Sequence, residues 1–233
     1  MGEPRWVAVG RLTRIREFTR RDVDRWQEWE RHTDALYTSY NPNPMDGSMR
    51  DAWYDDLVHR QGQSPFAIED LERRLIGRLF LRHIRRREGT AVLGIDLRAR
   101  FLGRGYGTDA LRAFLDHYFG PLGFQKMYLS VAAFNPRAYR LYENRGFRQF
   151  STHWQAVQAH SGVVSDPRYR EFDDVLRLTR EGVEALMHDM VLTRAGWLAA
   201  RRAAPAPRSE PRGSAEGRPV DSLTVDSRAD LAV

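Results

Sequence analysis

The chain has 233 residues and a hydrophobic content of 42%, so it can bury a sizeable core, and no apolar run approaches the ~20 residues of a membrane span. It has no cysteine, which excludes disulfides and thiol chemistry and suits a cytoplasmic protein without a secretory signal. The net charge of +6 comes from arginines scattered among 31 acidic residues, with Lys126 the only lysine, so we expect neither nucleic acid nor a membrane as a partner.

The N-terminal part is predicted to contain a strand, a helix and an irregular segment. Residues 7–18 place apolar side chains among arginines and indicate a strand. Thr19 and Asp22 resemble a capping box, so we expect a helix that carries Trp26 and Trp29 to begin there. Residues 32–49 contain two Asn-Pro pairs, which forbid a long helix. This aromatic segment either lines a substrate pocket or covers the core.

Three strands are expected next, over residues 65–69, 74–85 and 92–97. The second alternates apolar residues with charged or bulky ones, and a Glu-Gly turn separates it from the third. The third is short, apolar and β-branched, as a buried central strand would be.

A glycine-rich turn follows the central strand. Gly103, Gly105 and Gly107 alternate with larger residues, and Thr108 opens a helix that runs to Phe119 with one apolar face. Glycines at a helix N-terminus allow a ligand to approach the backbone, and the positive end of the helix dipole lies behind them. The stretch therefore predicts an anion site, most simply for a phosphate; a purely structural turn is the alternative.

The spacing of these glycines excludes two common nucleotide-binding motifs. A dinucleotide fingerprint needs an acidic residue about 20 positions on, but none lies between Asp116 and Glu143. A Walker loop needs a Gly-Lys-Ser/Thr ending, which is absent. The stretch instead resembles the Arg/Gln-x-x-Gly-x-Gly/Ala signature of the GNAT superfamily of acyl-CoA N-acyltransferases.

Two registers of that signature compete. Arg100-x-x-Gly103-x-Gly105 matches it literally. The family, however, places the first signature residue about five positions after the strand ends, which gives Leu102-x-x-Gly105-x-Gly107. We prefer this second register, in which Leu102 replaces the usual Gln or Arg.

A second motif makes the resemblance more specific. A strand over 126–132 is followed by Asn135 as a helix N-cap, and Gly146-Phe147 ends that helix. Tyr142 lies seven residues after Asn135, nearly two helical turns, and so returns to the same helix face. In the family, such an Asn contacts the pantetheine arm and such a Tyr meets the thioester sulfur. Taken alone, such a Tyr is more often a core or helix-face aromatic, and the two motifs together favour the catalytic role.

The resemblance implies an α/β protein with the GNAT fold. Its mixed, strongly twisted sheet is splayed between the fourth and fifth strands and flanked by helices. We assign residues 8–180 to this domain, with its last strands over 147–157 and 169–178. A C-terminal helix is expected over 181–202 and a disordered tail over 203–233.

The resemblance also implies the site residues and the chemistry. Acetyl-CoA is the expected co-substrate, with no metal, and a backbone N–H of the splayed strand would hold the thioester carbonyl oxygen. Tyr142 would protonate the departing thiolate, since a phenol with a pKa of ~10 can donate that proton. The residues expected to bind acetyl-CoA are Ile95, Asp96, Leu97, Gly103, Arg104, Gly105, Tyr106, Gly107, Thr108 and Asn135.

No residue stands out as the general base. Ala91 and Ser130 occupy the positions where relatives often carry a glutamate, and neither can serve. Glu69, His83 and Asp173 could act through a water, although each is also typical of a surface charge on a strand edge. A base is not needed if the amine arrives neutral.

The N-terminal strand and the tryptophan-bearing helix look most like the RimJ/RimL-type branch, which acetylates protein N-termini or small amines. We therefore predict an N-acetyltransferase that transfers an acetyl group from acetyl-CoA to a primary amine through a tetrahedral intermediate. It would act as a monomer or a homodimer. The alternative is a non-catalytic acyl-CoA sensor or interaction module that keeps the cofactor cleft.

Overall fold

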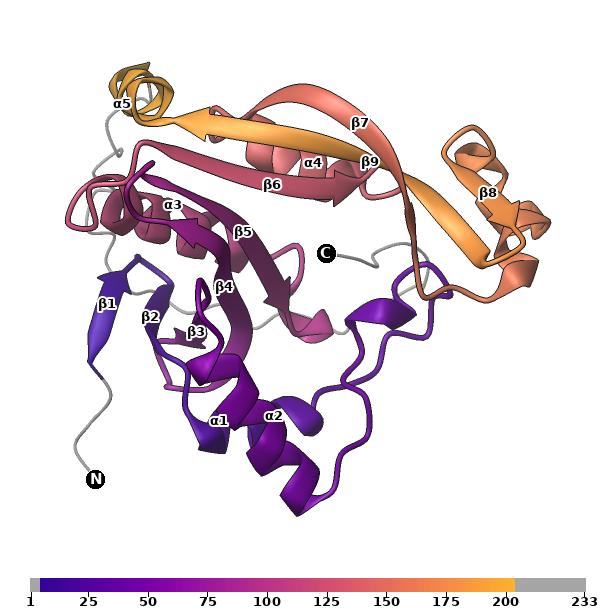
Figure 1. Cartoon of the computed structure of the whole chain (residues 1–233), viewed down its shortest axis with the longest axis horizontal. Helices are drawn as coiled ribbons and strands as arrows, with labels where there is room; N and C mark the ends of the chain where they lie inside the picture. The colour runs from indigo at the N-terminus through magenta and orange to yellow at the C-terminus, as the bar shows by residue number, and fades with distance from the viewer. Residues whose placement is uncertain (1–4, 204–233) are drawn as a thin grey trace, which may run out of the picture.

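The computed structural model describes residues 5–203, which form one mixed sheet flanked by helices (Figure 1). The sheet order is β1-β2-β3-β4-β5-β6-β9-β7, and β8 pairs with β9. The strands are β1 (Trp6–Val9), β2 (Thr13–Glu17), β3 (Ser64–Asp70), β4 (Leu75–Arg85), β5 (Thr90–Leu97), β6 (Lys126–Ala132), β7 (Arg148–Ala156), β8 (Leu176–Thr179) and β9 (Gly182–Thr193). The helices are α1 (Arg20–Gln27), α2 (Gly47–His59), α3 (Tyr106–Phe119), α4 (Pro136–Glu143) and α5 (Arg194–Ala203). Short 3₁₀ turns are η1 (Thr38–Tyr40), η2 (Ala99–Phe101), η3 (Ser161–Val164) and η4 (Pro167–Phe172).

The sheet opens between β5 and β6, which confirms the expected splayed GNAT fold. These two strands run parallel and pair only from Thr90 to Val92. In Figure 1 they start side by side and then diverge, so that β1–β5 and β6–β9 form two halves. Beyond Val92, one edge of β5 has no strand partner on the β6 side among residues 5–203.

Helices cover the two faces of the sheet unequally. The main core joins α3 and α4 to one face, where Phe114 and Tyr118 of α3 are fully buried. A smaller apolar cluster joins α1 and α2 to the other face of β3 and β4. Burial of such apolar stripes drives the packing of helices on a sheet. Between the two halves of the sheet lies a cleft, with residues of α1 and α2 on one side and residues of α4 on the other.

The N-terminal segment forms two strands, so the prediction of one strand over 7–18 is wrong in detail. The turn between β1 and β2 is held by Asp109 of α3, which accepts hydrogen bonds from the backbone N–H groups of Arg11 (2.9 Å), Leu12 (2.8 Å) and Thr13 (3.0 Å). Burial acts to raise the pKa of Asp109, but these hydrogen bonds lower it below its usual value. A Cβ on Gly10 would lie 2.0 Å from the Asp109 carboxylate, so the turn requires glycine.

The first helix and its neighbour partly follow the predictions. The capping box of Thr19 and Asp22 is present, but α1 ends at Gln27, before the last expected tryptophan. The segment over 32–49 is irregular until α2 begins at Gly47, where Asp46 caps the helix. The sequence prediction did not place α2 because its apolar residues show little periodicity.

The C-terminal predictions need correction. Residues 169–178 form η4 and the short β8 instead of one strand. The helix expected over 181–202 is wrong for its first part: residues 182–193 form β9, the longest strand, and only α5 is helical. Helix-forming residues such as Met and Leu favoured a helix, but β9 sits between β6 and β7, and pairing with both overrides local propensity. The sheet thus extends past residue 180, and the tail beyond 203 lies outside the described residues.

None of the helices within residues 5–203 combines the length and the apolarity needed to cross a membrane.

Candidate active site

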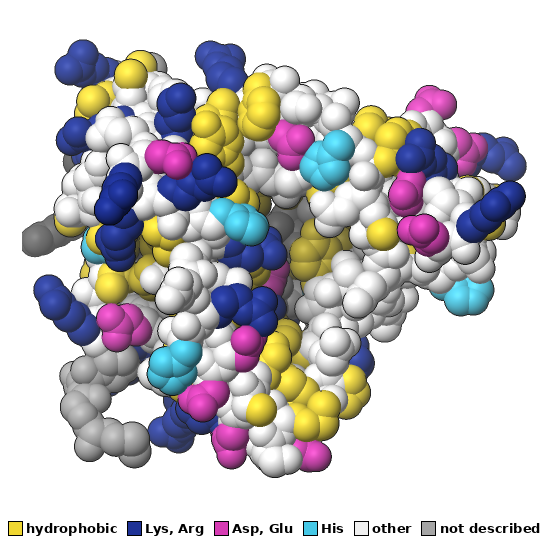
Figure 2. All heavy atoms as spheres, viewed as in Figure 1, with side chains coloured by type: hydrophobic (Ala, Val, Ile, Leu, Met, Phe, Trp, Pro, Cys, Tyr) yellow, Lys and Arg dark blue, Asp and Glu magenta, His cyan; other side chains and the backbone are white. Residues whose placement is uncertain are grey.

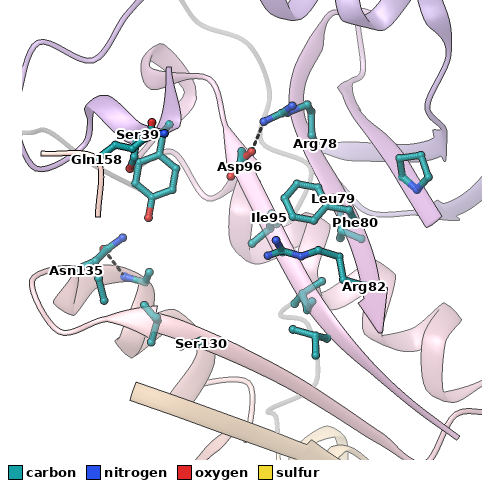
Figure 3. Close-up of a pocket in the computed structure, with 18 of the residues that line it drawn as sticks. Ser39, Arg78, Leu79, Phe80, Arg82, Ile95, Asp96, Ser130, Asn135 and Gln158 are labelled. Carbon is teal, nitrogen blue, oxygen red and sulfur yellow. Dashed lines mark hydrogen bonds and ion pairs between the residues drawn. The ribbon is translucent and has the colours of Figure 1, made fainter. Parts of the chain in front are cut away.

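A cavity of about 790 Å³ occupies the splay between β5 and β6. Its walls come from β4, β5, β6, α4, the α1–α2 region, η1 and the end of β7. Figure 2 shows a hollow near the middle of this face, with basic side chains at its edge. Figure 3 shows the side chains that point into it. The lining residues come from segments far apart in the sequence, from Phe18 to Met187, so the site forms only when the chain folds.

The glycine turn leads into the N-terminus of α3, next to the cavity but not among the residues that line it. Gly103 (φ +73°) and Gly105 (φ +84°) have left-handed backbones, which favour glycine, and Gly105 is the N-cap. The helix begins at Tyr106, two residues before the expected Thr108. The strand ends at Leu97, five residues before Leu102, as the preferred register assumed.

An arginine that the sequence analysis missed stands beside this turn. A Cβ built on Gly103 would lie 3.4 Å from Nη2 of Arg137, so the guanidinium covers the turn. Arg137 is the second residue of α4, directly after the Asn135-Pro136 start. A cation placed beside free N–H groups at a helix N-terminus strengthens an anion site. The sequence signal that could have identified Arg137 was its position directly after the predicted Asn135-Pro136 helix start.

The free edge of β5 carries the three residues expected near the thioester. Leu97 is buried in the main core, and its side chain comes within 2.9 Å of where a Cβ on Gly107 would lie, so strand and helix pack closely there. Ile95 and Asp96 line the cavity. Because β6 leaves β5 after Val92, the backbone groups on this edge can bind an extended ligand.

Asn135 is buried, and its side-chain oxygen accepts a hydrogen bond from the N–H of Ala138 (3.0 Å). It therefore caps α4 as the sequence predicted. Tyr40 of η1 also lines the cavity, and its hydroxyl is within hydrogen-bond reach of the Asn135 side chain. Burial first, and then the charge of Asp96, raise the pKa of Tyr40, and the hydrogen bond with Asn135 acts in the opposite direction.

Tyr142 lines the cavity from α4 and is only 7% exposed. Its ring packs edge-on against Phe147, with centroids 5.7 Å apart. Burial, then the neighbouring Tyr40 and Asp96, raise the pKa of Tyr142 well above its usual value. Its hydroxyl therefore stays protonated at neutral pH and can act as a proton donor.

Asp96 is the acidic side chain that lines the cavity among residues 5–203. It pairs with Arg78, its register partner on β4, at 2.5 Å (Figure 3). The Arg78 guanidinium lies 3.7 Å from the centroid of Trp26, which stacks on Trp53 of α2. Sequence reasoning placed Asp96 only as a backbone contact. The alternation along the strand puts Asp96 on the face opposite Ile95, but its pairing with Arg78 depends on the β4–β5 register, for which the sequence holds no local signal.

The three candidate bases lie outside the cavity lining. Glu69 is not a surface charge: it is buried and accepts hydrogen bonds from Arg16, which also binds Asp22 (2.6 Å) and so links β2, β3 and α1. His83 is on the exposed end of β4, and Asp173 follows η4. Burying one Arg between two carboxylates is a structural arrangement, since each charge satisfies the others.

The irregular segment performs both tasks that the sequence left open. Ser39, Tyr40 and Asn41 line the cavity. Tyr37 is buried on the C-terminal half, where its hydroxyl donates to the carbonyl of Phe134 (3.2 Å), and burial chiefly raises its pKa to about 12. The segment thus bridges the two halves of the sheet and closes one end of the cavity.

No group of three or more metal-ligating side chains is found within the part of the chain that the structure describes.

Comparisons with known proteins agree with this geometry. Residues 12–148 match a family model described as an acetyltransferase (GNAT) domain. Spermidine N(1)-acetyltransferase of Vibrio cholerae serotype O1 is 33% identical over 94 residues, which are 40% of this chain and 54% of that protein. The match therefore spans about half the length of this curated relative.

Solved structures show the same fold. Spermidine N-acetyltransferase from Vibrio cholerae, in a crystal structure with CoA and spermine, has a TM-score of 0.63 at 20% identity and covers 80% of this chain and 98% of that one. Spermidine/spermine N-acetyltransferase SpeG from Vibrio cholerae with manganese ions has a TM-score of 0.59 at 21% identity, covering 83% and 98%. At these identities, the likeness establishes the fold.

Proposed function

The chain belongs to the GNAT acetyltransferase family, and from this premise we propose that it transfers an acetyl group from acetyl-CoA to a primary amine. The observation that carries the proposal is the cavity in the splay, which brings Tyr142 opposite the free edge of β5 while the glycine turn lies close by. A buried proton donor beside an unpaired strand edge suits thioester chemistry better than simple ligand storage.

Acetyl-CoA would bind from the glycine turn into the cavity. The N–H groups at the start of α3 and the guanidinium of Arg137 would hold its phosphates. The amides of its pantetheine arm would pair with the free edge of β5, as an added strand does. Asn135 lies where this arm would enter, although its side-chain oxygen also caps α4.

The reaction follows from what the site offers. The neutral amine attacks the thioester carbonyl, and a backbone N–H near Ile95–Leu97 stabilises the resulting oxyanion. Collapse breaks the C–S bond, and the Tyr142 hydroxyl gives its proton to the leaving thiolate. The proton lost by the amine returns to Tyr142 through solvent. Burial raises the pKa of a thiol as it raises that of a phenol, so desolvation of the leaving thiolate offsets part of the raised pKa of Tyr142.

Asp96 would accept a hydrogen bond from the incoming amine. It is the acidic group on the cavity wall, and its charge reaches both Tyr40 and Tyr142. Pairing with Arg78 holds the carboxylate in place. This gives the site a group to orient the amine, in place of the glutamate that it lacks.

The acceptor amine is the open part of the proposal. The relatives named above act on spermidine, which suggests a polyamine, whereas the N-terminal elements suggested a RimJ/RimL-type enzyme for protein N-termini or small amines. We carry both as acceptor classes. A cytoplasmic monomer or homodimer is proposed as its working form.

The test combines binding and turnover on the full chain. Acetyl-CoA should raise the melting temperature in a concentration-dependent way, and NAD or ATP should do so much less. A panel of amines, assayed by release of free CoA and mass detection of acetylated product, should contain at least one substrate. Stabilisation by acetyl-CoA with no acetylated amine would instead favour the non-catalytic sensor.

A further inference from the structure

We propose that the acceptor carries a carboxylate in addition to its amine, and that Arg82 binds this carboxylate. The inference rests on the proposed acetyl transfer and names the class of its acceptor. It is carried by the charge of the cavity wall and by the position of Arg82 on β4.

The cavity wall holds more positive than negative charge. Its charged side chains, among the residues described, are Arg60, Arg78, Arg82 and Asp96. Arg78 and Asp96 neutralise each other, and Arg60 pairs with Asp56 one turn earlier. Arg82 makes neither an ion pair nor a hydrogen bond with any residue in the range 5–203. Arg82 is exposed to solvent, so one guanidinium without an ion-pair partner among the described residues remains at the cavity wall.

Arg82 is presented for binding. Figure 3 shows that it reaches from β4 into the cavity, on the same side as Arg78. Its guanidinium carbon lies 4.9 Å from the centroid of Phe80, so an aromatic ring supports it while its N–H groups stay free. A free guanidinium fork matches the two oxygens of a carboxylate.

The phosphates of acetyl-CoA do not explain this arginine. In the β4–β5 register, Gly77 faces Leu97, where the glycine turn follows, and Arg82 faces Val92. At ~3.4 Å per residue, Arg82 is about 17 Å further along the strand. The glycine turn also lies outside the cavity lining. The pantetheine arm has no anionic group to offer, so the acceptor is the molecule left to pair with Arg82.

A polyamine fits this wall poorly. Spermidine brings further ammonium groups, which need carboxylates or other acceptors in the site. Among the described residues, Asp96 is the one carboxylate on the cavity wall and is already paired with Arg78, whereas Arg82, which faces Val92 further along β4, has no ion-pair partner. An amino acid or a related zwitterion matches both ends: its amine lies toward Asp96 and Tyr142, and its carboxylate toward Arg82.

The experiment compares matched acceptors on the full chain with acetyl-CoA. The acceptors are the ω-amino acids from glycine to 6-aminohexanoate and phenylalanine, each with its C-terminal amide, together with spermidine. For the best carboxylate, kcat/KM should exceed that of its amide by about tenfold or more, since a charge-assisted pair is lost in the amide. The length of the best acceptor then reports the spacing between the amine and Arg82.

Variants assign the preference to Arg82. Arg82→Gln should bring the carboxylate-to-amide ratio close to one, and Arg82→Lys should retain part of it. The matched control is Arg85→Gln on the same strand, where Arg85 pairs with the exposed Glu88 outside the cavity, and it should keep the ratio. Melting curves should be unchanged in Arg82→Gln, because the side chain makes no hydrogen bond to the described protein.

Three outcomes would overturn the inference in different ways. A wild-type ratio near one, or spermidine as the best acceptor, would reject a carboxylate-bearing substrate but leave acetyl transfer standing. A ratio that survives Arg82→Gln would remove Arg82 from the site. Binding of acetyl-CoA with no acetylated amine of any charge would reject the proposed function itself, and the inference with it.

Discussion

The two walls of the cavity are built in different ways. What we call the cofactor wall is the Asn135–Tyr142 helix, which lines the cavity, together with the glycine turn next to the cavity. Each is continuous in sequence, and together they offer backbone groups and one hydroxyl. On the acceptor wall, side chains from β4, β5 and the α1–α2 region meet only in the folded chain. The difference suggests that the first wall fixes the reaction and the second fixes the substrate.

The largest expected effect concerns the cofactor wall. Tyr142→Phe keeps the ring against Phe147 but removes the proton for the thiolate. The single-turnover rate should fall by about 10²–10⁴, the usual contribution of a positioned general acid. Calorimetric affinity for acetyl-CoA should stay within a few-fold, and the free energy of unfolding should change by about 1 kcal/mol or less. Full activity in this variant would remove Tyr142 from the mechanism.

The acceptor wall should respond with a different signature. Asp96→Asn removes the acceptor of the amine hydrogen bond, so kcat/KM for the amine should fall by about 10- to 100-fold while acetyl-CoA affinity is unchanged. The free energy of unfolding should fall by about 1–3 kcal/mol, because Arg78 loses its charged partner. Asp173→Asn, outside the cavity, is the matched control and should behave like the wild type. Loss of acetyl-CoA affinity in Asp96→Asn would mean that the two walls are not separate.

These two walls also differ in how much of them the sequence predicted. The glycine turn, the Asn135 cap and Tyr142 were found because their spacing is local: turn and helix geometry place them whatever the rest of the chain does. The pairing of Arg78 with Asp96 depends on the β4–β5 register, and Trp26 reaches Arg78 only through the packing of α1 on the sheet. No local pattern contains that information.

The strand β9 illustrates the same limit in the fold. Its residues include several good helix formers, and a helix was predicted over them. Its pairing with both β6 and β7 decides the outcome, and the paired residues lie between 28 (Ala156 with Glu184) and 67 (Lys126 with Thr193) positions apart. The helices α3 and α4, which have both a local start signal and an apolar face, were predicted, whereas the capped helix α2, which has little apolar periodicity, and the strand β9 were not.

Arg137 provides a smaller test of the cofactor wall. Arg137→Gln should weaken acetyl-CoA binding by about tenfold and make the affinity less sensitive to salt, because one cation beside the phosphates is lost. Arg140→Gln, on the exposed face of the same helix, is the control and should bind normally. Equal affinities for both variants would show that the backbone N–H groups alone hold the phosphates.

The smallest expected effect concerns the pH dependence of the single-turnover rate, which should not decline at alkaline pH. Burial raises the pKa of Tyr142 above its usual value of about 10, so its hydroxyl stays protonated throughout the range in which the acceptor amine loses its proton. The single-turnover rate should therefore rise with pH and reach a plateau, with no descending limb below about pH 10. Stability changes above that pH, because the tyrosine of the unfolded chain ionises there while the buried Tyr142 does not. The free energy of unfolding therefore falls as the pH rises above about 10, and rates are measured only where the protein is folded. A descending limb with an apparent pKa between about 8 and 9, present in the wild type and retained in Tyr142→Phe, would assign the proton donor to another group. The cofactor wall would then no longer account for the chemistry, and the division between the two walls would fail.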